Sequence, residues 1–168
     1  MLSGWQNLLV PMAVSAVISF LVSKWVIDNG KRLKIIDDPK THALPKVVHK
    51  EPVPRGGGIP IFAALLVGCL LFMSMNTRVV GIIVALALLT LVGFLDDRFE
   101  EKISPYVRLL INIFAALCVV GVGIGIAFVT NPWGGVIELN WVLADVFALV
   151  WLVWMQNIVG WSSGVDGQ

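Results

Sequence analysis

Two adjacent carboxylates, Asp96 and Asp97, follow directly after an apolar run at residues 79–95. Neighbouring carboxylates repel each other, and a shared cation relieves that repulsion. Mg²⁺ suits such a pair, because it binds through a few carboxylates together with waters and phosphate oxygens. The pair is therefore a candidate for holding a divalent cation beside a phosphorylated substrate. A plain solvated helix end is the alternative that the pair alone leaves open.

A second segment combines an arginine with consecutive glycines. It reads Pro52-Val53-Pro54-Arg55-Gly56-Gly57-Gly58 and leads straight into another apolar run. Glycines before a helix allow backbone N–H groups to approach an anion, and the arginine side chain offers a forked donor to phosphate. A basic anchor with a hinge would explain the charge but not this density of proline and glycine. We therefore expect phosphate binding here.

The third polar segment covers residues 157–168. Asn157 stands at its beginning, and Gly164 and Gly167 flank Asp166 in a sequence typical of a tight turn. Such a turn can seat a carboxylate against a nucleotide or a sugar, although an ordinary surface turn has the same composition. This segment is a good candidate for a binding site only if the fold brings it close to the other two segments.

The composition indicates what positions these segments. The chain has 168 residues, of which 58% are hydrophobic and 14% charged, whereas a soluble domain is about half apolar and a quarter charged. We predict an all-α polytopic membrane protein with about five transmembrane helices, because each apolar run approaches the roughly 20 residues that cross a bilayer. The expected spans are residues 8–27, 59–75, 79–95, 107–129 and 141–159.

The basic residues predict the orientation of these spans. Lys24 and the seven Lys and Arg residues between Lys31 and Arg55 are eight of the twelve in the chain. Since cytoplasmic loops are enriched in Lys and Arg, the N-terminus is expected outside and the C-terminus in the cytoplasm. The polar segments 28–58, 96–106 and 157–168 then share the cytoplasmic face of a multi-pass protein in the cell membrane. A small transporter would need polar residues at mid-span, and these spans hold almost none.

Together, the three segments resemble the polyprenyl-phosphate N-acetylhexosamine-1-phosphate transferases, within glycosyltransferase family 4. The resemblance rests on five motifs and covers nearly the whole chain: Asp38-Pro39, Lys46-Val47-Val48-His49, Pro52-Val53-Pro54-Arg55-Gly56-Gly57-Gly58, Gly93-Phe94-Leu95-Asp96-Asp97-Arg98 and Gly164-Val165-Asp166-Gly167. The proline–arginine–glycine form looks more like the UDP-N-acetylglucosamine:undecaprenyl-phosphate branch than like the muramoyl-pentapeptide branch.

The resemblance implies a reaction and a set of roles. The reaction is transfer of a sugar-1-phosphate, expected to be N-acetylglucosamine-1-phosphate, from a UDP-sugar to polyprenyl phosphate with release of UMP, a step in cell wall biogenesis. The cofactor is expected to be Mg²⁺, with Mn²⁺ as the second choice. The resemblance assigns the site as follows: Asp96 and Asp97 as catalytic residues, Asp97 and Asn157 as metal ligands, and Lys46, His49, Arg55, Gly164, Asp166 and Gly167 as substrate-binding residues.

The chain departs from the family pattern in two ways. Gly160 and Ser163 replace an asparagine and an aspartate of the family's last motif, and family members are about twice as long. We therefore expect residues 1–168 to form a single transmembrane domain, the N-terminal half of a ten- or eleven-helix enzyme, inactive on its own. A truncated or degenerate non-catalytic paralogue is the alternative. The expected partners are the UDP-sugar, the lipid phosphate and the membrane, with no nucleic acid; a homodimer stays open.

Overall fold

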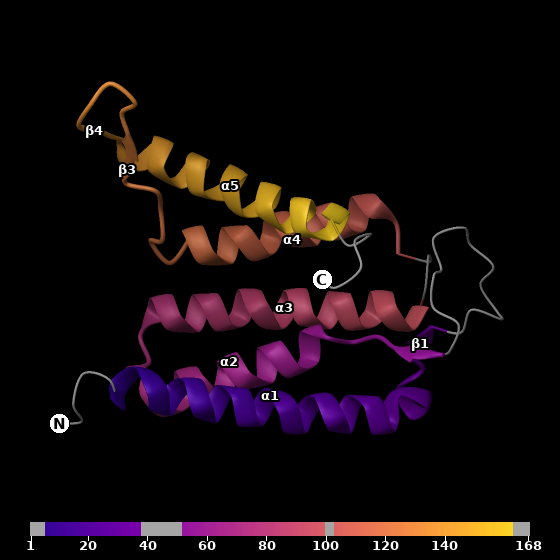
Figure 1. Ribbon diagram of the computed structural model, residues 1–168. Coiled ribbons are helices and arrows are strands. Elements are labelled where there is room, and N and C mark those ends of the chain that lie inside the picture. The colour runs from indigo at the N-terminus through magenta and orange to yellow at the C-terminus, as the bar shows by residue number, and fades with distance from the viewer. Residues whose placement is uncertain (1–5, 38–51, 100–102, 163–168) are drawn as a thin grey trace. The chain divides into compact units, whose positions relative to one another are not determined.

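The computed structural model describes residues 6–37, 52–99 and 103–162, and within these ranges it consists of five helices and four short strands (Figure 1). The prediction of a helical protein is confirmed. The chain divides into two compact units. Unit 1 contains residues 1–75 and 90–103, and unit 2 contains residues 76–89 and 104–168. The boundary crosses the long helix α3 (Thr77–Phe99), so each unit includes part of it.

In unit 1, α1 (Gln6–Leu33) packs against α2 (Gly58–Phe72). The two helices approach closely at Gly68, where an added Cβ would stand 3.2 Å from Ser15 Oγ. Small residues allow this contact between membrane helices, since lipid chains offer no hydrophobic drive to pull helices together. Strands β1 (Ile36–Asp37) and β2 (Val53–Pro54) then form a short antiparallel ribbon beyond the end of α1.

Helix α1 is longer than the sequence predicted. We expected it to end near Ile27, but it continues to Leu33 and includes residues assigned to the polar loop. Lys31 and Arg32 lie in its last turn, where positive charges are stabilised by the helix dipole. The helix stops at Lys34, which adopts a left-handed φ of 60°; Ile35 N–H then donates to Gly30 O at 3.2 Å.

In unit 2, α4 (Pro105–Val120) packs against α5 (Trp141–Ser162), and the antiparallel strands β3 (Phe128–Thr130) and β4 (Val136–Glu138) connect them. Alanines fill the buried positions of both helices, which allows the backbones to approach closely. The four buried alanines are Ala115, Ala116, Ala144 and Ala148.

One end of α4 follows from its local sequence, and the other departs from the predicted span. Ser104-Pro105 begins the helix, with Ser104 as the cap and Pro105 in the first turn, the position that proline favours. The helix ends at Val120, however, and not at residue 129. Gly123 adopts a positive φ of 80°, which a helix cannot accommodate. Gly123 therefore lies beyond the helix, and Gly125 allows a close approach to α5, since an added Cβ there would stand 2.9 Å from Asp145 Oδ1.

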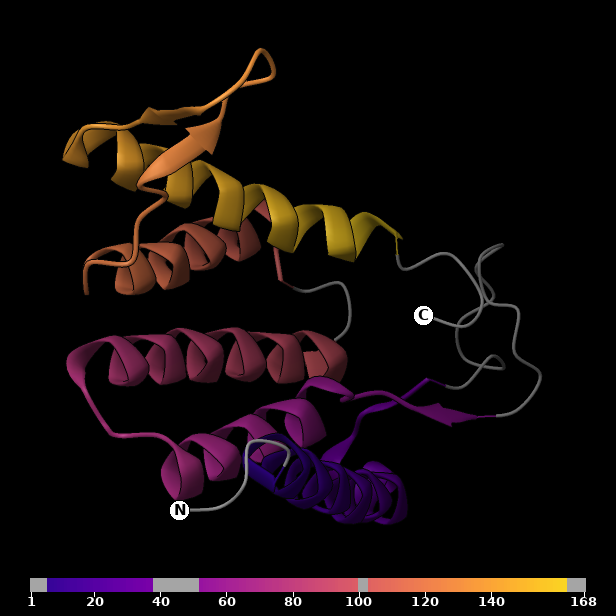
Figure 2. The same cartoon turned by 60° about the vertical axis from the view of Figure 1, so that its left-hand side comes forward.

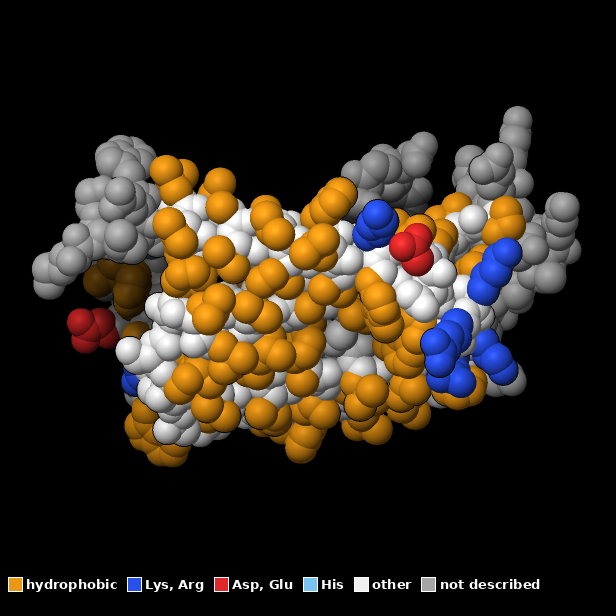
Figure 3. Space-filling model, turned by 90° about the horizontal axis from the view of Figure 1, so that it is seen from below, with side chains coloured by type: hydrophobic (Ala, Val, Ile, Leu, Met, Phe, Trp, Pro, Cys, Tyr) orange, Lys and Arg blue, Asp and Glu red, His pale blue; other side chains and the backbone are white. Residues whose placement is uncertain are grey.

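Three helical stretches among the described residues are long and apolar enough to cross a membrane, namely Leu8–Leu33, Thr77–Phe99 and Trp141–Ile158. Helices α2 and α4 are apolar but have only 15 and 16 residues, fewer than the roughly 20 that usually span a bilayer. The exposed face of α1 matches a membrane environment: apolar side chains cover most of its length, and the basic side chains gather at one end (Figure 3).

Candidate active site

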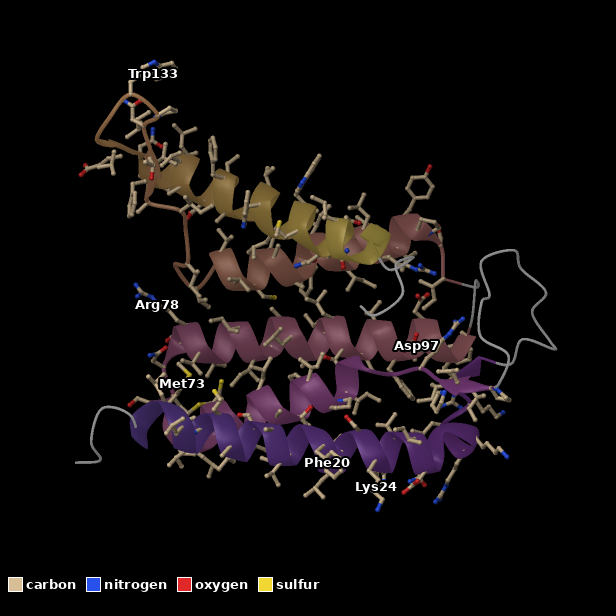
Figure 4. All side chains as sticks on the ribbon, viewed as in Figure 1. Phe20, Lys24, Met73, Arg78, Asp97 and Trp133 are labelled. Carbon is tan, nitrogen blue, oxygen red and sulfur yellow. The ribbon has the colours of Figure 1, made fainter. Side chains whose placement is uncertain are left out.

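Asp96 and Asp97 lie on the last turns of α3, within the helix. We predicted that the inner loop would begin at Asp96, but α3 continues to Phe99. Its start is set by Asn76, whose Oδ1 accepts a hydrogen bond from Val79 N–H at 3.0 Å, the usual way in which asparagine caps a helix. Figure 4 shows Asp97 near one end of α3, opposite Arg78. Because both residues lie within α3, the helix fixes the directions in which their carboxylates point from its axis.

The Asp97 carboxylate contacts the arginine–glycine segment. It accepts a hydrogen bond from the backbone N–H of Gly56, and it interacts electrostatically with Arg55 and with Asp96. All these groups belong to unit 1. Asp96, Asp97 and Arg55 are half-buried, so their charges interact more strongly than charges in open water would.

The β1–β2 ribbon fixes the Arg55–Gly56 corner. Arg55 N–H donates to Ile35 O at 2.7 Å, and Ile59 N–H donates to Gly56 O at 3.1 Å. Ile35 is only 1% exposed, and its Cδ1 atom would stand 3.0 Å from a Cβ on Gly56. Gly56 itself is buried with a φ of +99°, a conformation that side chains other than glycine adopt at a cost.

The three glycines therefore differ in what they do. We expected their N–H groups to face a bound anion, and Gly56 N–H instead meets the carboxylate of Asp97. Gly57 and Gly58 border open space, because an added Cβ would meet no atom within 4 Å at either position. They begin α2, where backbone N–H groups lack intrahelical partners. A phosphate could approach at these two residues.

An apolar groove of about 640 Å³ lies between α4 and α5 in unit 2. Its walls come from positions three or four residues apart on each helix, so that one stripe of each faces the groove. The lining residues are Pro105, Tyr106, Leu109 and Ile113 from α4, and Leu149, Val150, Val153, Trp154, Asn157 and Ile158 from α5. Since the groove is open and almost wholly apolar, it fits a flexible hydrocarbon chain.

Asn157 is the polar residue at one end of this groove. Its Nδ2 donates to Val153 O at 2.7 Å, which leaves Oδ1 as the atom able to bind a cation. Asn157 belongs to unit 2 and Asp97 to unit 1, so their assignment as joint metal ligands stays a prediction. Five further predicted residues lie outside the described part of the chain: Lys46, His49, Gly164, Asp166 and Gly167. Among the described residues, no group of three or more His, Cys, Asp or Glu side chains converges on one point.

Two parts of the site were missed by sequence reasoning. The first is Ile35, which buttresses the Gly56 corner; its signal was an Ile-Ile pair inside a basic loop. The second is the groove wall, for which Tyr106 and Trp154 are the largest contributors. The helical spacing of apolar residues in α4 and α5 contained that signal, but the same spacing is also expected of any packed or lipid-facing helix.

The fold and site define a multi-pass membrane protein with a carboxylate and an arginine on one polar corner. The family model for glycosyl transferase family 4 matches residues 79–168, and the chain belongs to this family. It is 27% identical to a probable undecaprenyl-phosphate N-acetylglucosaminyl 1-phosphate transferase of Bacillus subtilis, over 95% of this chain and 44% of that protein.

Other relatives carry related names. A phospho-N-acetylmuramoyl-pentapeptide-transferase of Streptococcus suis is 32% identical over 92% of this chain and 51% of its own. An undecaprenyl-phosphate alpha-N-acetylglucosaminyl 1-phosphate transferase of Yersinia pestis is 30% identical over 95% and 43%. The chain thus spans about half the length of the curated relatives it matches. No solved structure matches the chain significantly.

Proposed function

We propose that this protein transfers N-acetylglucosamine-1-phosphate from UDP-N-acetylglucosamine to polyprenyl phosphate and releases UMP. An oxygen of the lipid phosphate forms a bond to the sugar-bearing phosphorus. The bond from that phosphorus to the bridging oxygen breaks, and UMP leaves with the electron pair. Family membership and the names of the relatives support sugar-phosphate transfer to a polyprenyl lipid.

The observation that carries the proposal is the Asp97–Gly56–Arg55 corner. Phosphoryl transfer depends chiefly on positioning and on neutralising charge at the phosphates. Arg55 supplies a forked cationic donor for a phosphate, and Asp97 is held beside it by the Gly56 N–H. Without the carboxylate, the arginine would only bind anions. The pair allows both a phosphate and a cation to be held at one place.

The residues present fit a divalent cation. Asp97 uses one hydrogen bond to Gly56, and a carboxylate has about four acceptor positions, so capacity for a metal ion remains. Bound Mg²⁺ would neutralise charge on the diphosphate. Asp96 and Asp97 are the proposed residues that hold it, with Asn157 as a further ligand, and Mn²⁺ is the proposed substitute.

The groove between α4 and α5 is the proposed place for the isoprenoid chain of the acceptor. It is flanked by a helix able to span the membrane, α5, and it has a polar end at Asn157. A lipid with a phosphate head and a long apolar tail matches this distribution. We further propose that the reacting face is cytoplasmic. Most Lys and Arg residues lie in the polar segments that carry the candidate site, and such residues are enriched in cytoplasmic loops.

A non-catalytic role is the second candidate. Gly160 and Ser163 stand where the family pattern has an asparagine and an aspartate, and the loss of the asparagine, which contacts the metal in the family pattern, weakens a metal site. The presence of Asp96, Asp97 and Arg55 favours the enzyme. A test that measures turnover separates the two directly.

The test is an assay of UMP release by the full-length gene product in membranes. UDP-N-acetylglucosamine and polyprenyl phosphate are supplied with Mg²⁺, with Mn²⁺, or with a chelator. The proposal predicts UMP release that requires both the lipid and the metal ion. Release that persists with the chelator, or that is absent with every combination while the protein is folded, contradicts it. UDP-linked muramoyl pentapeptide in place of the sugar donor distinguishes the two branches of the family.

A further inference from the structure

The hairpin formed by β3, β4 and their connecting turn exposes apolar side chains on both faces. Val129 pairs with Ile137 on one face; Phe128 and Val136 lie on the other, together with Thr130 and Glu138. The four apolar side chains are between 40% and 59% exposed. A hairpin in water buries at least one apolar face against a core, and an isolated two-stranded ribbon is marginally stable there.

Trp133 stands at the tip of this hairpin and is 91% exposed. Figure 4 shows it projecting beyond the strands. A tryptophan ring is a costly residue to leave in water, since full burial of a large apolar side chain is worth about 1.5–3 kcal/mol. It is also the residue most typical of the membrane–water interface, where its ring lies among the headgroups and its N–H can reach water.

Three internal hydrogen bonds hold the turn at the tip. Asn131 N–H donates to Gly135 O and Gly134 N–H donates to Asn131 O, each at 3.0 Å. Trp133 N–H donates to Asn131 Oδ1 at 3.1 Å, and Pro132 has no N–H. Because these N–H groups are already paired, the cost of bringing the turn into a less polar layer is lower.

The base of the hairpin is attached to a membrane span. Leu139 N–H donates to Ala127 O at 2.9 Å, and Ile126 N–H donates to Ala144 O in the first turns of α5 at 3.1 Å. Helix α5 begins at Trp141, which is 78% exposed, and Figure 2 shows the strands beside this end of the helix. The hairpin therefore remains within a few residues of the level at which α5 enters the bilayer. No Lys or Arg occurs anywhere after Arg108.

From these observations we propose that the hairpin is an interfacial membrane anchor. It lies against the bilayer in which α5 is embedded, and it places Trp133 among the lipid headgroups. The lipid surface is the occupant because the face formed by Val129 and Ile137 is wholly apolar, Trp133 at the tip is 91% exposed, and the base of the hairpin adjoins the start of the membrane helix α5. The anchor fixes the depth of α5 at this end. This inference does not depend on the proposed transferase activity.

The test uses the fluorescence of Trp133 in the full-length gene product, in lipid nanodiscs. The signal of Trp133 is the difference between the wild type and Trp133→Phe, measured with lipids brominated near the top of the acyl chain and, separately, with aqueous iodide. The proposal predicts that brominated lipid removes most of this difference signal and that iodide removes little. Quenching by iodide alone means that the tip is in water, and quenching by neither means that protein covers it; each overturns the proposal.

A second measurement covers the case in which Trp133→Phe fails to fold. Cys69 and Cys118 are free, so both are replaced by Ala and a cysteine is introduced by Pro132→Cys, then labelled with an environment-sensitive fluorophore. In nanodiscs, its emission should lie at a shorter wavelength than the emission of the same fluorophore in water, and brominated lipid should quench it. A label at Arg78→Cys, in the first turn of α3, provides the comparison.

Discussion

At the level of single residues, the account rests on how Gly56 holds Asp97. The N–H of Gly56 can reach the carboxylate because the backbone turns through a positive φ at this residue, and Ile35 closes the space behind it. This idea is testable because Gly56 and Gly57 are both glycines but differ in burial: Gly56 is buried against Ile35, and Gly57 borders open space.

Gly56→Ala should therefore reduce transfer activity, and Gly57→Ala should not. An alanine at position 56 must adopt a left-handed φ, which costs about 1–2 kcal/mol, and its Cβ would stand 3.0 Å from Ile35 Cδ1. If the backbone relaxes, the N–H leaves Asp97, and a loss of roughly tenfold or more in kcat is expected for every 1.4 kcal/mol of lost positioning.

At Gly57, φ is −58° and a Cβ would meet no atom within 4 Å. Both variants are compared by UMP release and by thermal unfolding in detergent. An equal loss of activity in the two variants would contradict the role given to Gly56.

These residues could be identified as candidates from the sequence, but their contacts could not be predicted. Asp97, Arg55 and the glycines were all found as candidates, because carboxylate pairs and glycine-rich helix starts have recognisable chemistry. What escaped prediction was that one candidate would bind another. The Gly56–Asp97 hydrogen bond joins residues that are 41 positions apart in the sequence, and only the tertiary arrangement of unit 1 determines it.

At the level of helices and strands, the groove between α4 and α5 gives a second prediction. Leu109 lines the groove, and its neighbour Leu110 is 66% exposed and does not. Leu109→Trp should fill part of the groove and raise KM for polyprenyl phosphate several-fold, with KM for the UDP-sugar unchanged. Leu110→Trp, the same substitution one residue away, should leave both constants near wild type. A rise in KM for the sugar donor with Leu109→Trp would assign the groove to a different ligand.

The start of α3 gives a third prediction. Asn76 caps the helix through Val79 N–H. Asn76→Ala should lower the free energy of unfolding by about 1 kcal/mol, whereas Asn76→Asp should preserve it because aspartate caps equally well. Urea unfolding in detergent micelles measures both. If the alanine variant matches the wild type, the cap is not what holds this end of α3.

Element boundaries show where sequence patterns stop being informative. The caps at Ser104 and Asn140 were predictable because Ser and Asn side chains satisfy helix N–H groups, and Leu143 N–H does donate to Asn140 Oδ1 at 2.9 Å. The ends of α1 and α4 were not. A charged helical turn such as residues 28–33 resembles a loop in composition. Glycines that end a helix cannot be told by sequence from glycines that allow two helices to pack closely.

At the level of the whole molecule, the membrane orientation is the prediction most open to test. The charge distribution predicts Lys31 in the cytoplasm and the α2–α3 connection outside. Lys31→Cys and Ser74→Cys are made separately in a background of Cys69→Ala and Cys118→Ala. A membrane-impermeant maleimide should label Ser74→Cys in intact cells and Lys31→Cys only after permeabilisation. The reverse pattern would place the carboxylates on the outer face.

Asp97 is the residue on which the central claim depends, namely that this corner of unit 1 carries out transfer. Asp97→Asn keeps the size of the side chain and removes its charge, so both the cation site and the balance with Arg55 are lost. We predict that Mg²⁺-dependent UMP release falls by at least about a hundredfold, equivalent to roughly 2.7 kcal/mol, while thermal unfolding and membrane insertion stay close to wild type. Wild-type turnover in Asp97→Asn would contradict the account.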